Sequence, residues 1–258
     1  MAKKWSKFPH ADKAYAHDAA GLKKHWPRLH KGDCEPFPKD AAVQDAWRHF
    51  HAGEFAEAVE VGVKAGGAGQ NAAVKAQVVY ATYLEKSDKA KLALLEEAME
   101  WAEDRRAKMP KDPNAHYMFA FAAGRYGQGI SVAKALAQGL GTKVRDALLA
   151  AIKLEPKHAD AHIAFGSYQA EVIDKVGGLV AGMTYGAKKD SALEHFQKAL
   201  KLNADSAIAR VEYANGLIML LGKARIGDAE KLYKEAAACK PADAMERLDV
   251  ELAKSELS

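Results

Sequence analysis

Apolar residues recur three and four positions apart from about residue 40 onward, which is the spacing of one face of an α-helix. No stretch shows the sustained alternation of β-branched residues that is typical of a strand. Prolines and paired glycines interrupt the helical pattern at Gly66-Gly67, Pro110, Pro113, Pro156 and Pro241. The pattern therefore predicts an all-α chain, with helices over residues 114–127, 144–155, 160–174, 191–202, 206–221 and 227–238.

One motif repeats within this helical part, in residues 144–166, 192–214 and 229–241. In each copy a large residue (Leu148, Phe196 or Tyr233) precedes an alanine by three positions (Ala151, Ala199 or Ala236). Small residues allow paired helices to approach closely, and Pro156 and Pro241 stop a helix, so the motif resembles the second helix of a tetratricopeptide repeat (TPR). Residues 42–62 fit the same template, with Gly53 at the turn, whereas residues 71–109 match it less well. The resemblance implies a right-handed superhelix of antiparallel helix pairs.

Two neighbouring repeats carry insertions. A TPR separates the small residues of its two helices by about 12 positions, but here Ala120 and Val144 are 24 positions apart and Gly166 and Ala192 are 26 apart. The inserted segments, residues 124–143 and 174–190, are both apolar, rich in glycine and closed by lysines. We expect each to form an extra short helix that lies against an apolar surface.

The paired inserts indicate which TPR-like proteins the chain resembles. Together with Ala115-His116-Tyr117, residues 151–156 and residues 195–200, they resemble two TPR-like groups over about residues 70–237. One is the regulator of microtubule dynamics family, whose members include lipid-binding proteins at organelle contact sites. The other is the T-component of TRAP-type transporters, helical proteins with an apolar cavity or pore. Both resemblances imply a TPR-like fold with an apolar cavity.

The TPR resemblance also indicates which residues face the concave surface of the superhelix. A concave surface that grips a carboxylate-ended peptide needs several cationic and amide side chains, and only Arg125 and Asn215 qualify here. Arg125 and Glu171 occupy equivalent positions on adjacent helices, so we expect them to form an ion pair. The inner face is otherwise apolar, which favours a hydrophobic ligand or a buried insert.

The leading interpretation is a non-enzymatic binding protein with a hydrophobic pocket for a lipid-like or other hydrophobic small molecule. The alternative is a protein–protein interaction scaffold whose insertions only fill the groove as core, which is the commoner fate of such apolar stripes. In the first case Lys134, Lys143, Lys188 and Lys189 would attract an anionic head group, and Gly182→Leu would fill the cavity. The candidate ligand-binding residues are Tyr117, Phe121, Arg125, Tyr126, Ile130, Leu136, Tyr168, Val176, Leu179, Met183, Tyr185 and Asn215.

The net positive charge of the chain is concentrated in its first 33 residues. Residues 1–33 hold eight Lys and Arg against three Asp, a balance of +5, while the whole chain carries +4. The remainder is thus nearly neutral, which argues against nucleic acid as the main partner. We expect a basic N-terminal extension over residues 1–39 and a TPR-like helical domain over residues 40–258. Trp5, Phe8, Trp26 and Phe37 are expected to dock the extension onto the body, and its histidines to be solvated.

Candidate chemistry is sparse. The segment from His158 to His162 has a spacing that can bind a metal, but Pro156 places it across a turn and a helix start, where Asp160 serves better as a cap or a first-turn acid. We therefore predict no catalytic residue, no metal and no cofactor. Cys34 and Cys239 form no Cys-x-x-Cys pair, and the chain shows neither an apolar leader nor a membrane-spanning run. These features favour a cytoplasmic protein.

Overall fold

The computed structural model describes residues 5–257, and in that range the chain is built of helices and contains no strand. Two short 3-10 helices, η1 (Lys13–Tyr15) and η2 (Gly222–Arg225), accompany the α-helices. The α-helices are α1 (Ala19–Leu29), α2 (Ala41–Ala52), α3 (Phe55–Ala65), α4 (Gly69–Tyr83), α5 (Asp88–Lys108), α6 (Pro113–Ile130), α7 (Val132–Ala137), α8 (Leu140–Leu154), α9 (Ala159–Val176), α10 (Gly178–Tyr185), α11 (Lys189–Leu202), α12 (Ala207–Leu221), α13 (Ile226–Ala237) and α14 (Ala244–Ser255).

The predicted all-α, TPR-like fold is confirmed. Helices α6, α8, α9, α11, α12 and α13 match the six predicted segments, and each insert adds a short helix, α7 or α10. Local chemistry explains the boundaries: the Asp112 carboxylate accepts hydrogen bonds from the first backbone N–H groups of α6, and Gly53, at φ 82°, ends α2. None of the described helices is long and apolar enough to cross a membrane.

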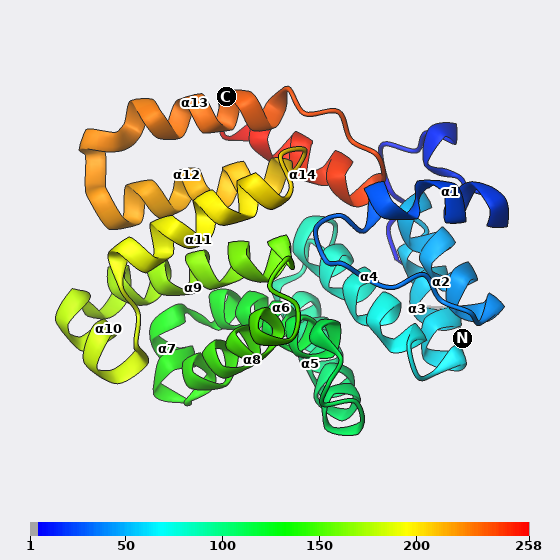
Figure 1. Cartoon of the computed structure of the whole chain (residues 1–258), viewed down its shortest axis with the longest axis horizontal. Helices are drawn as coiled ribbons and strands as arrows, with labels where there is room; N and C mark the ends of the chain where they lie inside the picture. The colour runs from blue at the N-terminus through cyan, green and yellow to red at the C-terminus, as the bar shows by residue number, and fades with distance from the viewer. Residues whose placement is uncertain (1–4, 258) are drawn as a thin grey trace.

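Consecutive helices stack in antiparallel pairs that curve into a superhelix (Figure 1). The pairs are α2/α3, α4/α5, α6/α8, α9/α11 and α12/α13, and the inserted helices α7 and α10 lie beside α8 and α9. After α13 the chain crosses to the N-terminal helices, where α14 begins, and α14 then runs back along α12 and α13, so that it contacts α2 as well as these two helices (Figure 1). The stack is thus closed on itself by α14.

Small residues permit close packing between the pairs. The Phe196 side chain of α11 is fully buried, and it lies between Gly166 of α9 and Gly216 of α12. A Cβ atom would lie 2.9 Å from the Phe196 ring at Gly166 and 2.5 Å from it at Gly216. The repeated pattern of small and large residues therefore reflects a ring held between two helix backbones.

The start of the chain packs against the body, as its aromatic residues predict. Trp5 stacks on Tyr80 with ring centroids 4.0 Å apart, and Trp26 is buried in the core. The expectation of solvated histidines is wrong for His30, whose side chain is buried among Trp26, Asp33 and His51. Burial lowers the pKa of His30 to about 4.

Three polar side-chain contacts join α14 and its N-cap to the N-terminal half, and we call them the closing contacts. Arg28 donates to both carboxylate oxygens of Glu246, at 2.5 and 2.8 Å. His51 lies 2.7 Å from Asp243, which also caps the start of α14. The Tyr83 hydroxyl donates to Asp249 at 2.5 Å. The two ends of the superhelix are therefore held together by polar contacts between residues far apart in sequence.

Candidate functional site

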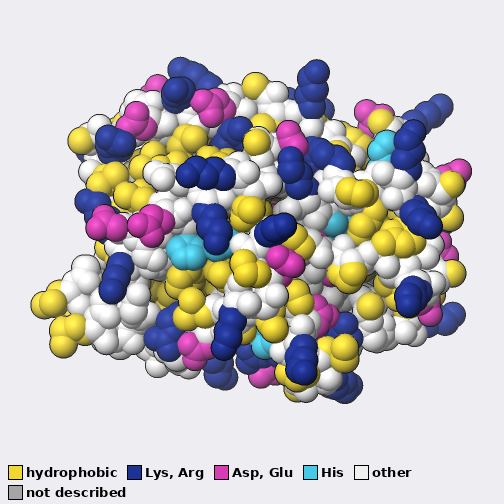
Figure 2. Space-filling model, viewed as in Figure 1, with side chains coloured by type: hydrophobic (Ala, Val, Ile, Leu, Met, Phe, Trp, Pro, Cys, Tyr) yellow, Lys and Arg dark blue, Asp and Glu magenta, His cyan; other side chains and the backbone are white. Residues whose placement is uncertain are grey.

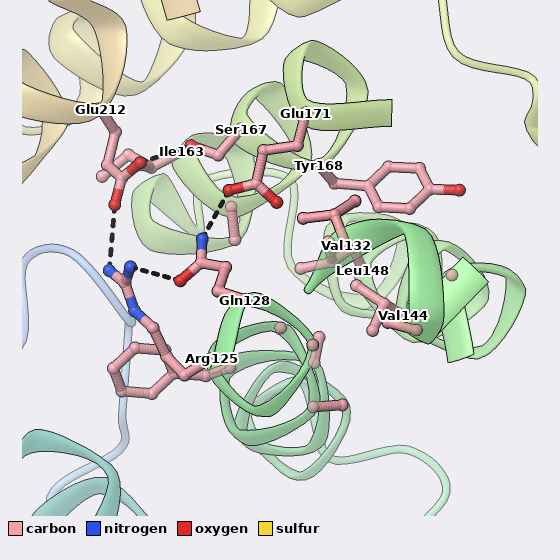
Figure 3. Close-up of a pocket in the computed structure, with 18 of the residues that line it drawn as sticks. Arg125, Gln128, Val132, Val144, Leu148, Ile163, Ser167, Tyr168, Glu171 and Glu212 are labelled. Atoms are coloured by element: carbon pink, nitrogen blue, oxygen red, sulfur yellow. Dashed lines mark hydrogen bonds and ion pairs between the residues drawn. The ribbon is translucent and has the colours of Figure 1, made fainter. Parts of the chain in front are cut away.

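A cavity of about 120 Å³ lies where α6, α7, α8 and α9 meet, and we call it the inner cavity (Figure 3). Residues of α4, α12 and α14 complete its lining. Most of its wall is aliphatic or aromatic, formed by Tyr117, Phe121, Val132, Leu136, Leu140, Val144, Leu148, Ile163, Ala164, Tyr168, Val172, Ile208 and Met245, among others.

The first insert builds one side of this cavity. Ser131 turns the chain with φ 83°, and its hydroxyl accepts a hydrogen bond from the Lys134 backbone at the start of α7. Helix α7 then places Leu136 against α8, where a Cβ on Gly141 would lie 2.4 Å from the Leu136 side chain. Because glycine stands at that position, the insert can lie close to α8 and present Val132 and Leu136 to the cavity.

Polar side chains gather on one side of the cavity, and we call Arg125, Gln128, Ser167, Glu171 and Glu212 the polar mouth (Figure 3). Arg125 Nη2 donates to Glu212 Oε1 at 2.9 Å, and Arg125 Nη1 donates to Gln128 Oε1 at 3.0 Å. Gln128 Nε2 donates to Glu171 Oε1 at 2.5 Å, while Ser167 Oγ donates to Glu212 Oε2 at 3.0 Å. Gln128 is exposed, so this side of the cavity meets solvent.

The predicted ion pair between Arg125 and Glu171 is wrong. Arg125 pairs with Glu212 of α12 instead, and Gln128 lies between Arg125 and Glu171 as a hydrogen-bonded bridge. The prediction assumed that residues at equivalent positions of adjacent repeats lie opposite each other, and it took no account of the curvature of the superhelix. That curvature brings α12 within reach of α6 although α9 stands between them in the stack.

Burial changes the protonation of the lining carboxyl groups. Desolvation raises the pKa of Glu171 to about 7 and the pKa of Asp160 to about 6. Burial acts to lower the pKa of Arg125, but the neighbouring Glu212 outweighs it and the guanidinium stays charged. Near neutral pH the charge of the site therefore depends on the state of Glu171.

The structure brings only part of the predicted ligand-binding set together. Five of the residues line the inner cavity: Tyr117, Phe121, Arg125, Leu136 and Tyr168. Tyr126, Val176 and Tyr185 are partly buried against the same core without lining the cavity, and Ile130 also lies outside the lining. Asn215 is engaged elsewhere, because it accepts a hydrogen bond from the Tyr233 hydroxyl.

The second insert faces solvent. Leu179 and Met183 of α10 are 78% and 82% exposed, and hydrophobic side chains project at the left of Figure 2, where Figure 1 places α10. A Cβ on Gly182 would approach only the Ala187 carbonyl, at 3.8 Å, so Gly182→Leu does not fill the cavity as expected. None of the four lysines expected near an opening lines the inner cavity. Of the two similar inserts, the first covers the cavity and the second does not.

Other lining residues escaped the sequence reasoning. Glu212 lies one helical turn before Asn215, and Gln128 lies one helical turn after Arg125. These two positions could have been found by widening the counted stripe. Met245 could not, because α14 does not carry the repeat motif.

The histidines after Pro156 have structural partners. The His158 ring caps α9 by accepting from the Ala161 backbone at 3.1 Å, and its other nitrogen lies 2.9 Å from Asn114. His162 lies 2.7 Å from the His195 ring. Asp160 stands in the first turn of α9, one of the two roles expected for it. Within residues 5–257 no group of three or more His, Cys, Asp or Glu is arranged to hold a metal ion.

Comparison with known proteins places this geometry in a family. Among solved structures, a thermophilic TPR protein from Thermus thermophilus superposes with a TM-score of 0.56, over 83% of this chain and 97% of that one, at 16% sequence identity. That likeness supports the TPR-like fold. No curated protein matches the chain. The sequence model of regulator of microtubule dynamics protein 1-3 matches residues 70–257, which include the whole inner cavity, so the chain belongs to this family.

Proposed function

We propose that the protein is a non-enzymatic binding protein that holds a hydrophobic small molecule in the inner cavity. The observation that carries the proposal is the division of the lining into broad apolar walls and one polar mouth, which is the usual composition of a ligand site. Tyr117, Phe121, Leu136 and Tyr168 would contact the apolar part of the ligand. Arg125 and its partners would meet the polar part.

The volume limits what can enter. An apolar cavity of about 150 Å³ engineered into another protein binds benzene, and the inner cavity measures about 120 Å³. It therefore fits one small ring or a short alkyl segment in the conformation described. A longer lipid-like chain would insert only its end unless the walls move apart.

The proposal is tested by filling the cavity from Gly124. This residue of α6 belongs to the lining, and a Cβ placed on it meets no atom within 4 Å, so Gly124→Leu should occupy the space without a clash. The matched control is Gly182→Leu, which adds the same side chain to α10 outside the cavity. We expect benzene or hexan-1-ol to raise the melting temperature of the wild type and of Gly182→Leu but not of Gly124→Leu.

Far-UV circular dichroism of all three proteins checks that the helices remain. The cavity proposal fails if Gly124→Leu binds the probes as well as the wild type does. It also fails if the wild type binds neither probe.

A scaffold role is the second candidate, and the exposed apolar face of α10 favours it. Leu179, Val180 and Met183 are all exposed, and contiguous exposed apolar side chains often mark a surface that contacts another protein. Failure of the wild type to bind either probe would favour this role over the cavity.

A further inference from the structure

The charged residues that line the inner cavity are unequal in number. Three carry carboxyl groups, Asp160, Glu171 and Glu212, and one carries a guanidinium, Arg125. The positive charge of the buried Lys75 acts on Asp160, but Lys75 does not line the cavity, and its ammonium is 2.6 Å from Asp33 and is held there. The lining thus has an excess of negative charge whenever Glu171 is ionised.

The single cation is already engaged. Arg125 uses Nη2 for Glu212 and Nη1 for Gln128. An anionic head group at the mouth would have to displace Glu212 from Arg125 or remain close to Glu171 and Glu212 without a cation of its own. Either arrangement costs free energy, because like charges repel strongly where water is partly excluded.

Hydrogen-bond acceptors, in contrast, remain open. Glu171 Oε1 accepts from Gln128, and no described residue donates to its other carboxylate oxygen, which points away from Gln128 in Figure 3. The Asp160 carboxylate also accepts no hydrogen bond within residues 5–257, but it lies at the other end of α9, against Gly32, and does not belong to the polar mouth. The Tyr168 hydroxyl is a donor without a partner in that range, but it points away from the polar mouth (Figure 3).

We propose that the ligand of the inner cavity is a compact apolar amine, whose ammonium group lies at the polar mouth and donates to Glu171. The proposal rests on the proposed function and adds the chemical class of the ligand. An ammonium brings several donors and a positive charge to a site that offers open acceptors and excess negative charge. A carboxylate or phosphate of the same size needs hydrogen-bond donors and positive charge, whereas this site offers acceptors and negative charge.

Affinity for an amine should then depend on pH. The groups that face Glu171 are Gln128 and Arg125 from α6, Glu212 from α12 and Lys175 from its own helix, and Lys175 is paired with Asp174. Burial raises the pKa of Glu171 to about 7, so this carboxyl loses its proton mainly between about pH 6 and 8. An alkylammonium stays protonated over that range, so its affinity should rise with pH.

Three probes with one chain and different head groups test the idea: hexan-1-amine, hexan-1-ol and hexanoate. Isothermal titration at pH 8 should show the amine binding at least about tenfold more tightly than hexanoate, with hexan-1-ol between them. Glu171→Gln should weaken the amine by about tenfold, change hexan-1-ol by less than about twofold, and remove the rise of amine affinity between pH 6 and 8. Glu230→Gln, an exposed acid on α13, is the control that should change nothing.

The outcomes separate the two proposals. If hexanoate binds as tightly as the amine, or if Glu171→Gln keeps the full amine preference, the amine proposal is overturned while the cavity proposal stands. If none of the three probes binds the wild type but benzene does, the amine proposal alone is overturned, and if benzene fails as well, the proposed function itself fails. Should Glu171→Gln not fold, the order of the three probes on the wild type still decides the matter.

Discussion

At the scale of single residues, Arg125 shows what can and what cannot be predicted about a side chain from the sequence. Repeat counting placed it on the inner face, and it lines the inner cavity. Its partner could not be derived in the same way, because Glu212 lies 87 positions away and the distance between them depends on how three helix pairs curve. The sequence thus predicts which face a side chain occupies, whereas its partner across the groove depends on the assembled superhelix.

The pair of Arg125 and Glu212 should be strongly coupled. Their side chains are only 22% and 13% exposed, so removal of one leaves the other charge poorly solvated. We expect Arg125→Met and Glu212→Gln each to lower the free energy of unfolding by about 2–4 kcal/mol, and the double variant to lose about 1–3 kcal/mol less than the sum. Urea unfolding of the four proteins measures this coupling.

The matched control is the cycle of Arg125→Met with Glu171→Gln. Because Arg125 and Glu171 interact through Gln128, which hydrogen-bonds to both, their coupling should be smaller than that between Arg125 and Glu212. A coupling to Glu171 as large as that to Glu212 would contradict the arrangement at the polar mouth.

At the scale of helices, the sequence predicted which segments are helical and about how long each helix is. It predicted less well where the inserted helices lie in the fold. Proline stops and small-residue spacing define the paired helices, because both act locally on the backbone. The two inserts look alike in sequence, yet α7 covers the inner cavity and α10 leaves its apolar side chains in solvent. Their placement depends on whether the adjacent groove has room, and composition does not carry that information.

The packing of α11 between α9 and α12 makes a prediction at this scale. A methyl group at Gly216 would lie 2.5 Å from the Phe196 ring, and the ring cannot retreat because Gly166 is close on its other side. Gly216→Ala should therefore lower the free energy of unfolding by about 1–3 kcal/mol, although alanine favours helix.

Gly227→Ala is the control for that substitution. Gly227 lies in α13, and a Cβ there meets no atom within 4 Å. This variant should be neutral or more stable by up to about 1 kcal/mol. Chemical denaturation compares the two, and equal effects would mean that Phe196 can move aside.

At the scale of the whole molecule, the feature that the sequence did not predict is the closure by α14. This helix lacks the repeat motif, and the closing contacts join residues between 166 and 218 positions apart. No local pattern encodes such contacts. They require the complete curvature of the stack, which decides where α14 meets α2 and α4.

One closing contact should make the stability of the protein depend on pH. Burial raises the pKa of Asp249 from the ordinary 3.8 to about 8. The folded state therefore holds a proton that the unfolded state has released, and stability falls as pH rises from about 4 to about 8. Asp249→Asn cannot lose a proton, so near pH 9 it should be more stable than the wild type by up to about 6 kcal/mol, which corresponds to the difference between pKa values of 3.8 and about 8.

Thermal unfolding of both proteins from pH 5 to pH 9 measures this difference. Other buried groups titrate in both proteins, so their contributions cancel in the comparison. Asp228→Asn, at an exposed position of α13, should follow the wild type at every pH. A constant offset between Asp249→Asn and the wild type would show that Asp249 does not titrate in this way.

Closure by α14 also limits how this family member can change in length. In an open solenoid each repeat contacts only its neighbours, so units can be gained or lost at little structural expense. Here a duplicated helix pair would rotate and translate α14 away from α2, and Glu246, Asp243 and Asp249 would no longer reach Arg28, His51 and Tyr83. The number of repeats is therefore fixed by geometry, as the number of subunits is fixed in a closed ring.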